Sequence, residues 1–162
     1  MPKIKVSLYL KFVFLFSLSA LFLAYFIEYV LGHQPCNLCL IERIPYALSL
    51  LVVLINYKFK KIEKYLIFFL AIIFFFSLII SIYHFGIEQG FFQESIICEV
   101  KSGNNILSKE EILQELQRRI ISCRDVTFRV FGFSLTTINI VISLFLTILL
   151  TKIFISYEKF KN

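Results

Sequence analysis

Four long apolar stretches, separated by short polar or charged segments, dominate the pattern of this chain. They cover residues 12–31, 44–57, 65–83 and 133–151. A helix that crosses a membrane needs about 20 mostly apolar residues. The second stretch is too short for this, so its helix is expected to begin earlier, giving a span of about 40–57 whose first turns lie at the membrane boundary. The pattern predicts an all-α membrane protein, built as a four-helix transmembrane bundle.

The amino-acid composition supports the same class. Hydrophobic residues make up 59% of the chain and the mean hydropathy is +0.82, whereas apolar usage in soluble domains is about 45–50%. A chain of 162 residues has room for a few spans and one sizeable loop, so we expect a single domain over residues 1–162 with an outer loop over about 84–132. The first span also has features of a secretory signal. Its apolar run is longer than a signal core, however, and no cleavage site of the A-x-A type follows it before Cys36, so it is expected to remain as a span.

Lysine placement predicts the orientation of the spans, because Lys and Arg beside spans favour the cytoplasmic side. Ten lysines lie before the first span, between the second and third, and after the fourth, accompanied only by Glu63 and Glu158: they are Lys3, Lys5, Lys11, Lys58, Lys60, Lys61, Lys64, Lys152, Lys159 and Lys161. Both termini and the middle turn are therefore expected in the cytoplasm, and the long loop outside. The net charge of +6 reflects this topology. Membrane lipid, and no nucleic acid, is the expected partner of such a surface.

All four cysteines, Cys36, Cys39, Cys98 and Cys123, fall in the outer segments. An oxidising outer compartment allows persistent disulfides. Four cysteines permit three pairings, of which Cys36–Cys39 with Cys98–Cys123 is the natural one, and the close spacing of the first pair makes it the expected resting state. A disulfide between Cys98 and Cys123 would stabilise the fold by about 3.5 kcal/mol in the chain-entropy model. Closing the very short Cys36–Cys39 loop removes almost no unfolded-state entropy, so this C-x-x-C pair indicates a redox centre rather than a brace.

A zinc site is the alternative use of such cysteines. Structural zinc sites usually combine two close pairs of thiolate or imidazole ligands. Here Cys98 and Cys123 lie far apart in the sequence, and the chain has no second C-x-x-C motif. No metal site is therefore expected.

The segment HQPCNLCLIER, residues 33–43, places an arginine one helical turn beyond the second cysteine. If a helix begins near Pro35, Cys36 and Cys39 lie in its first turn, where free backbone N–H groups and the helix dipole stabilise a thiolate. Arg43 would lie on the same face as Cys39, one turn deeper. Its cation suits the polarisation of an electron-accepting carbonyl or the stabilisation of a thiolate. The alternative is an arginine that extends to the surface or pairs with Glu42 or Glu28.

The motif PCNLCLIER, with Arg43 four residues after the second cysteine, resembles the DsbB family of bacterial inner-membrane thiol:quinone oxidoreductases. The resemblance extends over almost the whole chain. It includes four spans with both termini inside, C-x-x-C at the outer start of the second span, a second cysteine pair in the outer loop, and Gly132 within VFGF before the fourth span.

The resemblance implies a role for each cysteine. Cys98 would accept attack from a reduced periplasmic dithiol protein of the DsbA type, and Cys123 would be the resolving partner that passes electrons to Cys36. Cys39 would then be the sulfur that faces a bound quinone, either ubiquinone or menaquinone. The implied location is the bacterial inner membrane, with the cysteines on the periplasmic side.

The resemblance also implies quinone contacts. Arg43 would contact the quinone, and His84 with Glu88, four residues later in YHFGIEQG, resembles the quinone-side residues of the family. The alternative for His84 is an ordinary histidine at a polar boundary. Glu28 and Asn139 are costly in lipid and are expected to face the bundle interior, where they bond across helices or border the quinone pocket.

The outer loop contains a helical pattern in SKEEILQELQRRI, residues 108–120. Ser108 and Glu111 form a capping box, and an apolar stripe follows at helical spacing. The pattern predicts a short amphipathic helix that lies on the outer membrane face and holds Cys123 near Cys36, or one that packs on the bundle.

Two other functions remain open. One is a thiol/quinone enzyme similar to vitamin K epoxide reductase, in which the C-x-x-C motif lies in a late span and the loop cysteines precede it, the reverse of the order found here. The other is a non-enzymatic membrane protein whose disulfides brace its outer loop.

Overall fold

The computed structural model describes residues 3–93, 98, 122–124, 128–130 and 132–159. The predicted amphipathic helix over residues 108–120 lies outside the described residues. In chain order the elements are α1 (Lys3–Tyr29), α2 (Asn37–Ile41), α3 (Ile44–Lys58), the 3-10 turn η1 (Lys60–Ile62), α4 (Glu63–Glu88), β1 (Arg129–Val130), β2 (Phe133–Ser134) and α6 (Leu135–Lys159).

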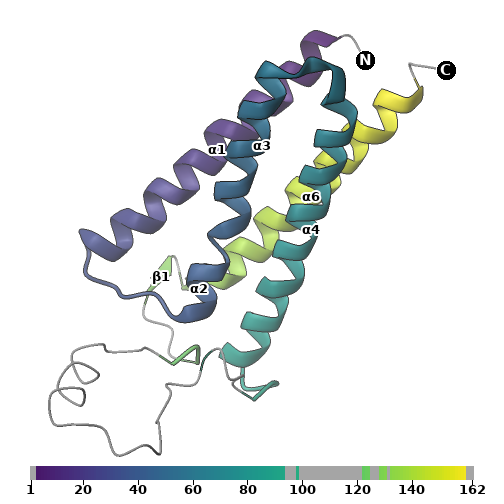
Figure 1. Cartoon of the computed structure of the whole chain (residues 1–162). Coiled ribbons are helices and arrows are strands. Elements are labelled where there is room, and N and C mark those ends of the chain that lie inside the picture. Colours follow the sequence, from purple (N-terminus) through teal and green to yellow (C-terminus); the bar gives the residue numbers. More distant parts are fainter. Residues whose placement is uncertain (1–2, 94–97, 99–121, 125–127, 131, 160–162) are drawn as a thin grey trace, which may run out of the picture.

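Four helical segments are long and apolar enough to cross a membrane, which confirms the predicted four-span architecture. They are Val6–Tyr29, Asn37–Lys58, Glu63–Glu88 and Leu135–Tyr157. The helices pack as α1 on α3, α3 on α4, and α4 on α6. Figure 1 shows both termini at the same end of the bundle as the turn between α3 and α4. The lysine-rich segments therefore share one end, and the cysteines lie toward the other.

The second span is broken into α2 and α3 by a turn at Glu42 and Arg43. Pro45 lies in the first turn of α3, and a proline has no N–H to donate to the carbonyl of the residue four positions earlier, here Ile41. The helix expected over 40–57 therefore starts at Asn37 and changes course at residues 42 and 43. Because of this turn, the adjacent side chains of Glu42 and Arg43 point to different helices: Glu42 bonds to His84 of α4 and Arg43 to Glu28 of α1.

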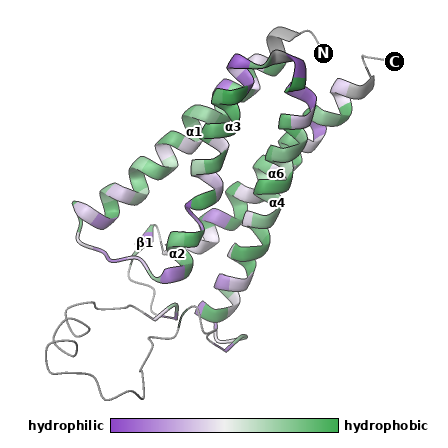
Figure 2. Ribbon diagram, viewed as in Figure 1, coloured by the Kyte–Doolittle hydropathy of each residue, from purple (hydrophilic) through white to green (hydrophobic). Residues whose placement is uncertain are grey.

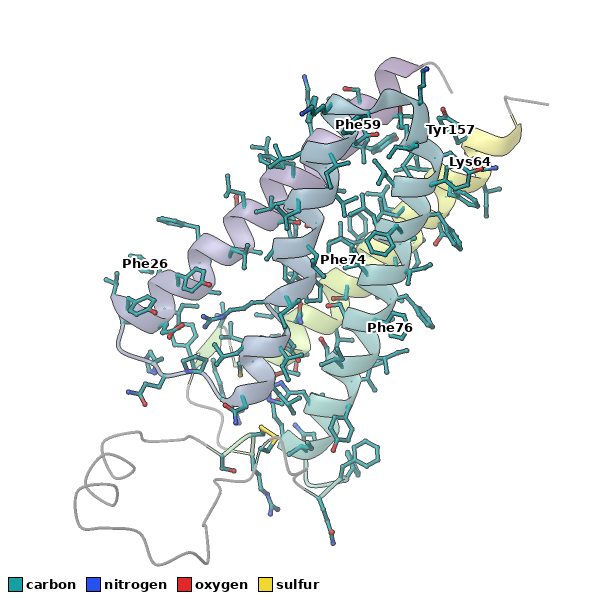
Figure 3. All side chains as sticks on the ribbon, viewed as in Figure 1. Phe26, Phe59, Lys64, Phe74, Phe76 and Tyr157 are labelled. Atoms are coloured by element: carbon teal, nitrogen blue, oxygen red, sulfur yellow. A yellow bond between two sulfur atoms is a disulfide. The ribbon has the colours of Figure 1, made fainter. Side chains whose placement is uncertain are left out.

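Apolar side chains cover the outside of the bundle as well as its interior. Figure 2 shows hydrophobic residues along most of the length of the helices and hydrophilic ones chiefly near the ends. Phe26 and Phe76 are exposed and point away from the bundle, whereas Phe74 lies fully buried between the helices (Figure 3). An exterior of this kind fits lipid contact, because lipid tails are as apolar as the side chains that meet them.

Buried hydroxyl groups join the helices across the interior. Ser49 of α3 donates a hydrogen bond to Ser17 of α1 over 2.7 Å, and the hydroxyls of Ser77 and Ser143 join α4 to α6 over 3.1 Å. Small side chains let the helix backbones approach, and hydroxyls bond across the contact, as is typical of membrane helices.

The two short strands form a hairpin immediately before α6. Arg129 pairs with Ser134 and Val130 with Phe133, in antiparallel register. Gly132 lies in the connecting turn with φ +87°, a left-handed conformation that favours glycine. The VFGF sequence therefore makes a tight turn that leads the outer loop back into the fourth span.

Candidate functional site

The C-x-x-C pair lies at the start of α2. Cys36 is the N-cap residue, and its Sγ accepts a hydrogen bond from the backbone N–H of Cys39 over 3.3 Å. The two sulfurs are 2.7 Å apart, and both cysteines are free thiols in this structure. The expected resting disulfide is therefore not what the structure contains. The N-cap sulfur of Cys36 instead accepts a hydrogen bond from one of the otherwise unpaired N–H groups at the start of α2.

Cys36 is held in surroundings that favour its thiolate. The hydrogen bond from the Cys39 thiol, together with the nearby His84 ring, lowers the pKa of Cys36 well below its usual range, although burial opposes this. His84 approaches from α4, with Nε2 3.5 Å from the Cys36 sulfur. Its other nitrogen, Nδ1, lies 3.0 Å from Oε1 of Glu42. An imidazole placed between a thiol and a carboxylate can accept a proton on one side and release it on the other.

The loop cysteines form the predicted disulfide between Cys98 and Cys123, with Cα atoms 5.6 Å apart. Both are buried in one apolar cluster with Cys36, Leu38 and Ile87. Figure 3 shows the disulfide as the yellow bond at the end of the bundle opposite the chain termini. The fold thus brings together cysteines that lie far apart in the sequence, and the pairing of Cys98 with Cys123 is confirmed.

A cavity of about 340 Å³ opens beside Cys39, between α1, the α2–α3 turn and α6. Most of its lining is apolar. The polar and charged side chains in that lining come from Ser19, His33, Gln34, Glu42, Arg43, Tyr46, Thr136 and Asn139. Its size and its mainly apolar lining, which includes polar and charged side chains, are typical of a small-molecule site.

Arg43 lies in the wall of this cavity and pairs with α1. Its Nη1 donates to Oε2 of Glu28 over 2.5 Å, and its guanidinium carbon lies 5.0 Å from the centre of the Tyr25 ring. The side chain is only 14% exposed, so it does not extend to the surface. Of the alternatives that the sequence left open, the structure selects the pair with Glu28. A guanidinium fixed by a carboxylate and an aromatic face is a positioned cation rather than a mobile one.

Asn139 of α6 connects the cavity to the interior of the bundle, as expected for a polar residue within a span. Its amide donates to Oε2 of Glu42 over 3.1 Å and to the Ser81 hydroxyl over 2.8 Å. Its Oδ1 accepts from the Tyr46 hydroxyl over 2.5 Å. Glu42 therefore bonds to His84 on one oxygen and to Asn139 on the other. Sequence reasoning considered Glu42 only as a partner for Arg43, although a carboxylate three residues after a redox cysteine was a signal for such a role.

His84 and Glu88 lie in the last turns of α4 rather than in the outer loop, and neither lines the cavity. His84 contacts the Cys36 sulfur, as described above. Oε1 of Glu88 accepts a hydrogen bond from Thr136 over 2.6 Å and lies 4.0 Å from Nε2 of His84. His84 therefore lies beside the C-x-x-C pair with Glu88 next to it, whereas Cys39 and Arg43 line the cavity.

Replacing Tyr46 by phenylalanine is expected to lower the stability of the bundle by about 1–2 kcal/mol. The substitution keeps the ring that packs edge-on against Phe74, with centroids 5.7 Å apart, but removes the donor to the buried Asn139 oxygen. Thermal unfolding in detergent measures the change. Tyr65→Phe is the matched control, because Tyr65 is 71% exposed. Equal effects of the two substitutions would contradict a structural role for the Tyr46–Asn139 hydrogen bond.

Comparison with known proteins identifies a family whose sequence model matches this chain. The sequence model of the family described as disulfide bond formation protein DsbB matches residues 7–153. An uncharacterized protein of Rickettsia prowazekii (strain Madrid E) is 32% identical over 139 residues, which cover 83% of this chain and 79% of that protein. No solved structure matches the chain.

Proposed function

The chain belongs to the DsbB family of disulfide bond formation proteins, which are membrane thiol oxidoreductases, and from that premise we propose that it oxidises a reduced DsbA-type dithiol protein and delivers the electrons to a membrane quinone. The observation that carries the proposal is the position of Cys39. It is half of a dithiol, and it lines an apolar cavity that also contains a fixed guanidinium. The proposed location of the protein is the bacterial inner membrane, with the lysine-rich end in the cytoplasm and the cysteines outside.

The first half of the proposed reaction is thiol–disulfide exchange at the outer end of the bundle. A thiolate of the reduced partner attacks Cys98, which forms a mixed disulfide and releases Cys123 as a thiolate. The released sulfur attacks Cys36 of the oxidised inner disulfide and releases Cys39 as a thiolate. The second thiol of the partner attacks the mixed disulfide, which releases the oxidised partner and Cys98. Cys98 then attacks Cys123, which restores the loop disulfide and releases Cys36. Cys98 and Cys123 are both buried, so this end of the molecule must open before the partner reaches Cys98. The shared cluster that contains Cys36, Cys98 and Cys123 supports a short transfer between the pairs.

The second half occurs at the inner pair. When the inner dithiol becomes a disulfide it gives up two electrons and two protons. His84 is placed to accept a proton from Cys36 and to pass it to Glu42, which lines the cavity. Proton release can therefore be directed toward the cavity without exposing the thiols to water.

The cavity has the properties that a quinone site requires. The bound quinone supplies a two-electron, two-proton acceptor. The apolar lining would hold the ring and tail of a quinone, and Arg43 would offer its guanidinium to a carbonyl oxygen. Glu28 and the Tyr25 ring hold that cation in place before the reaction. Among the described residues, Cys39, Arg43 and Glu42 are the groups that we propose meet the quinone.

The decisive experiment combines purified protein with a reduced DsbA-type protein and a short-chain quinone. Ubiquinone and menaquinone analogues are tested separately. The expected result is catalytic loss of the quinone absorbance, with one quinone reduced for each disulfide formed in the partner. If folded protein with its loop disulfide intact reduces neither quinone in the presence of the partner, the proposed function is wrong.

Replacing Arg43 by alanine is expected to slow quinone reduction about 100-fold, because one preorganised charge is removed from the site of developing negative charge. Exchange of the Cys98–Cys123 disulfide with the reduced partner should stay within a few-fold of wild type. Steady-state quinone reduction and single-turnover thiol trapping measure the two halves separately.

Arg43→Lys is the matched variant, since it keeps the charge but loses the planar fork that binds Glu28. It should fall between wild type and Arg43→Ala. An equal loss in both half-reactions would indicate that Arg43 supports the fold at the α2–α3 turn and not the quinone site.

A further inference from the structure

We propose that the reduced C-x-x-C pair forms, with His84 and Glu88, a binding site for Zn²⁺ that exists only while the pair is a dithiol. The site would make zinc a redox-gated inhibitor of this end of the molecule and not a resident cofactor. It depends on the cluster geometry and is independent of the quinone and of the dithiol partner.

Three donor atoms of the types that zinc prefers already lie together. One ligand atom each from Cys36, Cys39 and His84 falls within 4.8 Å of the others. The distance from the Cys36 sulfur to Nε2 of His84 is 3.5 Å, close to the edge of about 3.6 Å expected between S and N ligands of tetrahedral zinc. The sulfurs must move apart by about 1 Å to reach a tetrahedral S–S edge. Cys36 precedes the helix as its N-cap, so a change in its side-chain rotamer suffices.

The orientation of His84 is that of a zinc ligand. Its Nδ1 lies 3.0 Å from the Glu42 carboxylate, which leaves Nε2 directed at the sulfur. Metal-ligating histidines commonly bond through the second ring nitrogen to a carboxylate, which fixes the ring and raises its basicity. Glu42 supplies that support here, and Asn139 holds Glu42 in turn.

Glu88 supplies an independent observation that points to a cation. Its side chain is 6% exposed, and its Oε2 has no hydrogen-bond partner within the part of the chain that the structure describes. Its other oxygen is held by Thr136 and lies 4.0 Å from Nε2 of His84. A buried carboxylate oxygen without a partner is unfavourable, and a metal ion beside His84 would satisfy it. Glu88 lies outside the trio of close donor atoms formed by Cys36, Cys39 and His84, so its carboxylate must turn toward Nε2 of His84 to become the fourth ligand.

The donor set selects the metal. Two thiolates, one imidazole and one carboxylate in a tetrahedral arrangement suit Zn²⁺, whereas Mg²⁺ and Ca²⁺ require oxygen ligands. From the sequence no metal site was expected, because Cys98 and Cys123 lie far apart and the chain has no second C-x-x-C motif. The fold alters this premise, since α4 brings an imidazole and a carboxylate to the thiols.

Zinc binding and oxidation of the pair exclude each other. Binding converts two thiols and one Zn²⁺ into a zinc dithiolate and releases two protons, with no change of oxidation state. A disulfide has no thiolate to offer the metal. Bound zinc would therefore keep Cys36 and Cys39 reduced and prevent their oxidation until the metal dissociates.

Metal titration of the full-length Cys98→Ser/Cys123→Ser protein tests the site with only the inner thiols present. Co²⁺ is the spectroscopic probe, because thiolate coordination gives a charge-transfer band. We expect one Co²⁺ per reduced chain, displaced by one Zn²⁺, and no band for the oxidised protein. Equal binding by the reduced and oxidised forms would overturn the proposal.

Two variants and one control identify the ligands. His84→Ala and Glu88→Gln are each expected to weaken zinc binding by about 100-fold or more, because each removes a direct ligand and the loss of an outer-shell partner alone costs about 10–100-fold. Glu88→Gln is nearly isosteric and removes the charge without opening a cavity, so it keeps the test valid if His84→Ala fails to fold. His33→Gln is the control, because His33 lies against Phe128 and outside the cluster. Unchanged zinc affinity in both ligand variants would show that the thiols bind metal without α4, contrary to the proposal.

Discussion

Replacing Cys39 by serine is expected to reduce quinone turnover to the uncatalysed background, a loss of about 1000-fold or more. A serine hydroxyl cannot form a disulfide, so the inner pair can neither store nor release two electrons. Cys39 is also the cysteine that lines the cavity, and the substitution changes only one atom of that lining. Quinone absorbance in the presence of excess reduced partner measures the effect.

The first half-reaction provides the internal control. In Cys39→Ser the Cys98–Cys123 disulfide remains available, so the variant should still oxidise about one equivalent of partner in a single turnover and then stop. Acid quenching with thiol alkylation detects that equivalent. Turnover of the Cys39→Ser protein at more than about a tenth of the wild-type rate would refute the assignment, because electrons would then reach the quinone without the inner pair.

The four spans were predictable because membrane crossing imposes a simple requirement, about 20 apolar residues in one run. The ends of the helices were not. α1 extends back to Lys3, and α4 continues through Glu88, because backbone hydrogen bonding carries a helix beyond its apolar section into polar sequence. The break in the second span is a local effect of Pro45, which the sequence contains but which hydropathy does not weigh.

The candidate site was predictable where its chemistry is local. The C-x-x-C spacing and the arginine one turn later follow from a dozen residues, and the loop pairing follows from having two cysteines left over. The network around Glu42 could not be predicted in this way. Its partners are His84 of α4 and Asn139 of α6, which reach it only because three helices pack together. Sequence periodicity identifies a buried polar residue but not the helix that will satisfy it.

The position of His84 and Glu88 shows the same limit. The resemblance to the DsbB family implied quinone contacts for both residues. In the structure His84 contacts the Cys36 sulfur, and neither residue lines the cavity that we propose for the quinone. The sequence pattern of a histidine near the end of a span is the same whether its ring contacts a quinone or the Cys36 sulfur. The distinction depends on which face of α4 meets α2, and that is decided by the packing of whole helices.

Replacing both loop cysteines by serine is expected to separate the two sources of electrons. The Cys98→Ser/Cys123→Ser protein should lose reaction with the DsbA-type partner by about 1000-fold, because no disulfide remains for the partner to attack. It should retain most of its quinone reduction when a small dithiol such as dithiothreitol reduces the inner pair directly. Parallel assays with the two reductants measure this separation. The rate with dithiothreitol is also the control for folding, because the variant lacks a disulfide that stabilises the fold by about 3.5 kcal/mol in the chain-entropy model. If the partner still drives turnover in this variant, the inner pair receives electrons directly, and the burial of Cys98 and Cys123 beside Cys36 then reflects bracing of the outer end rather than electron transfer.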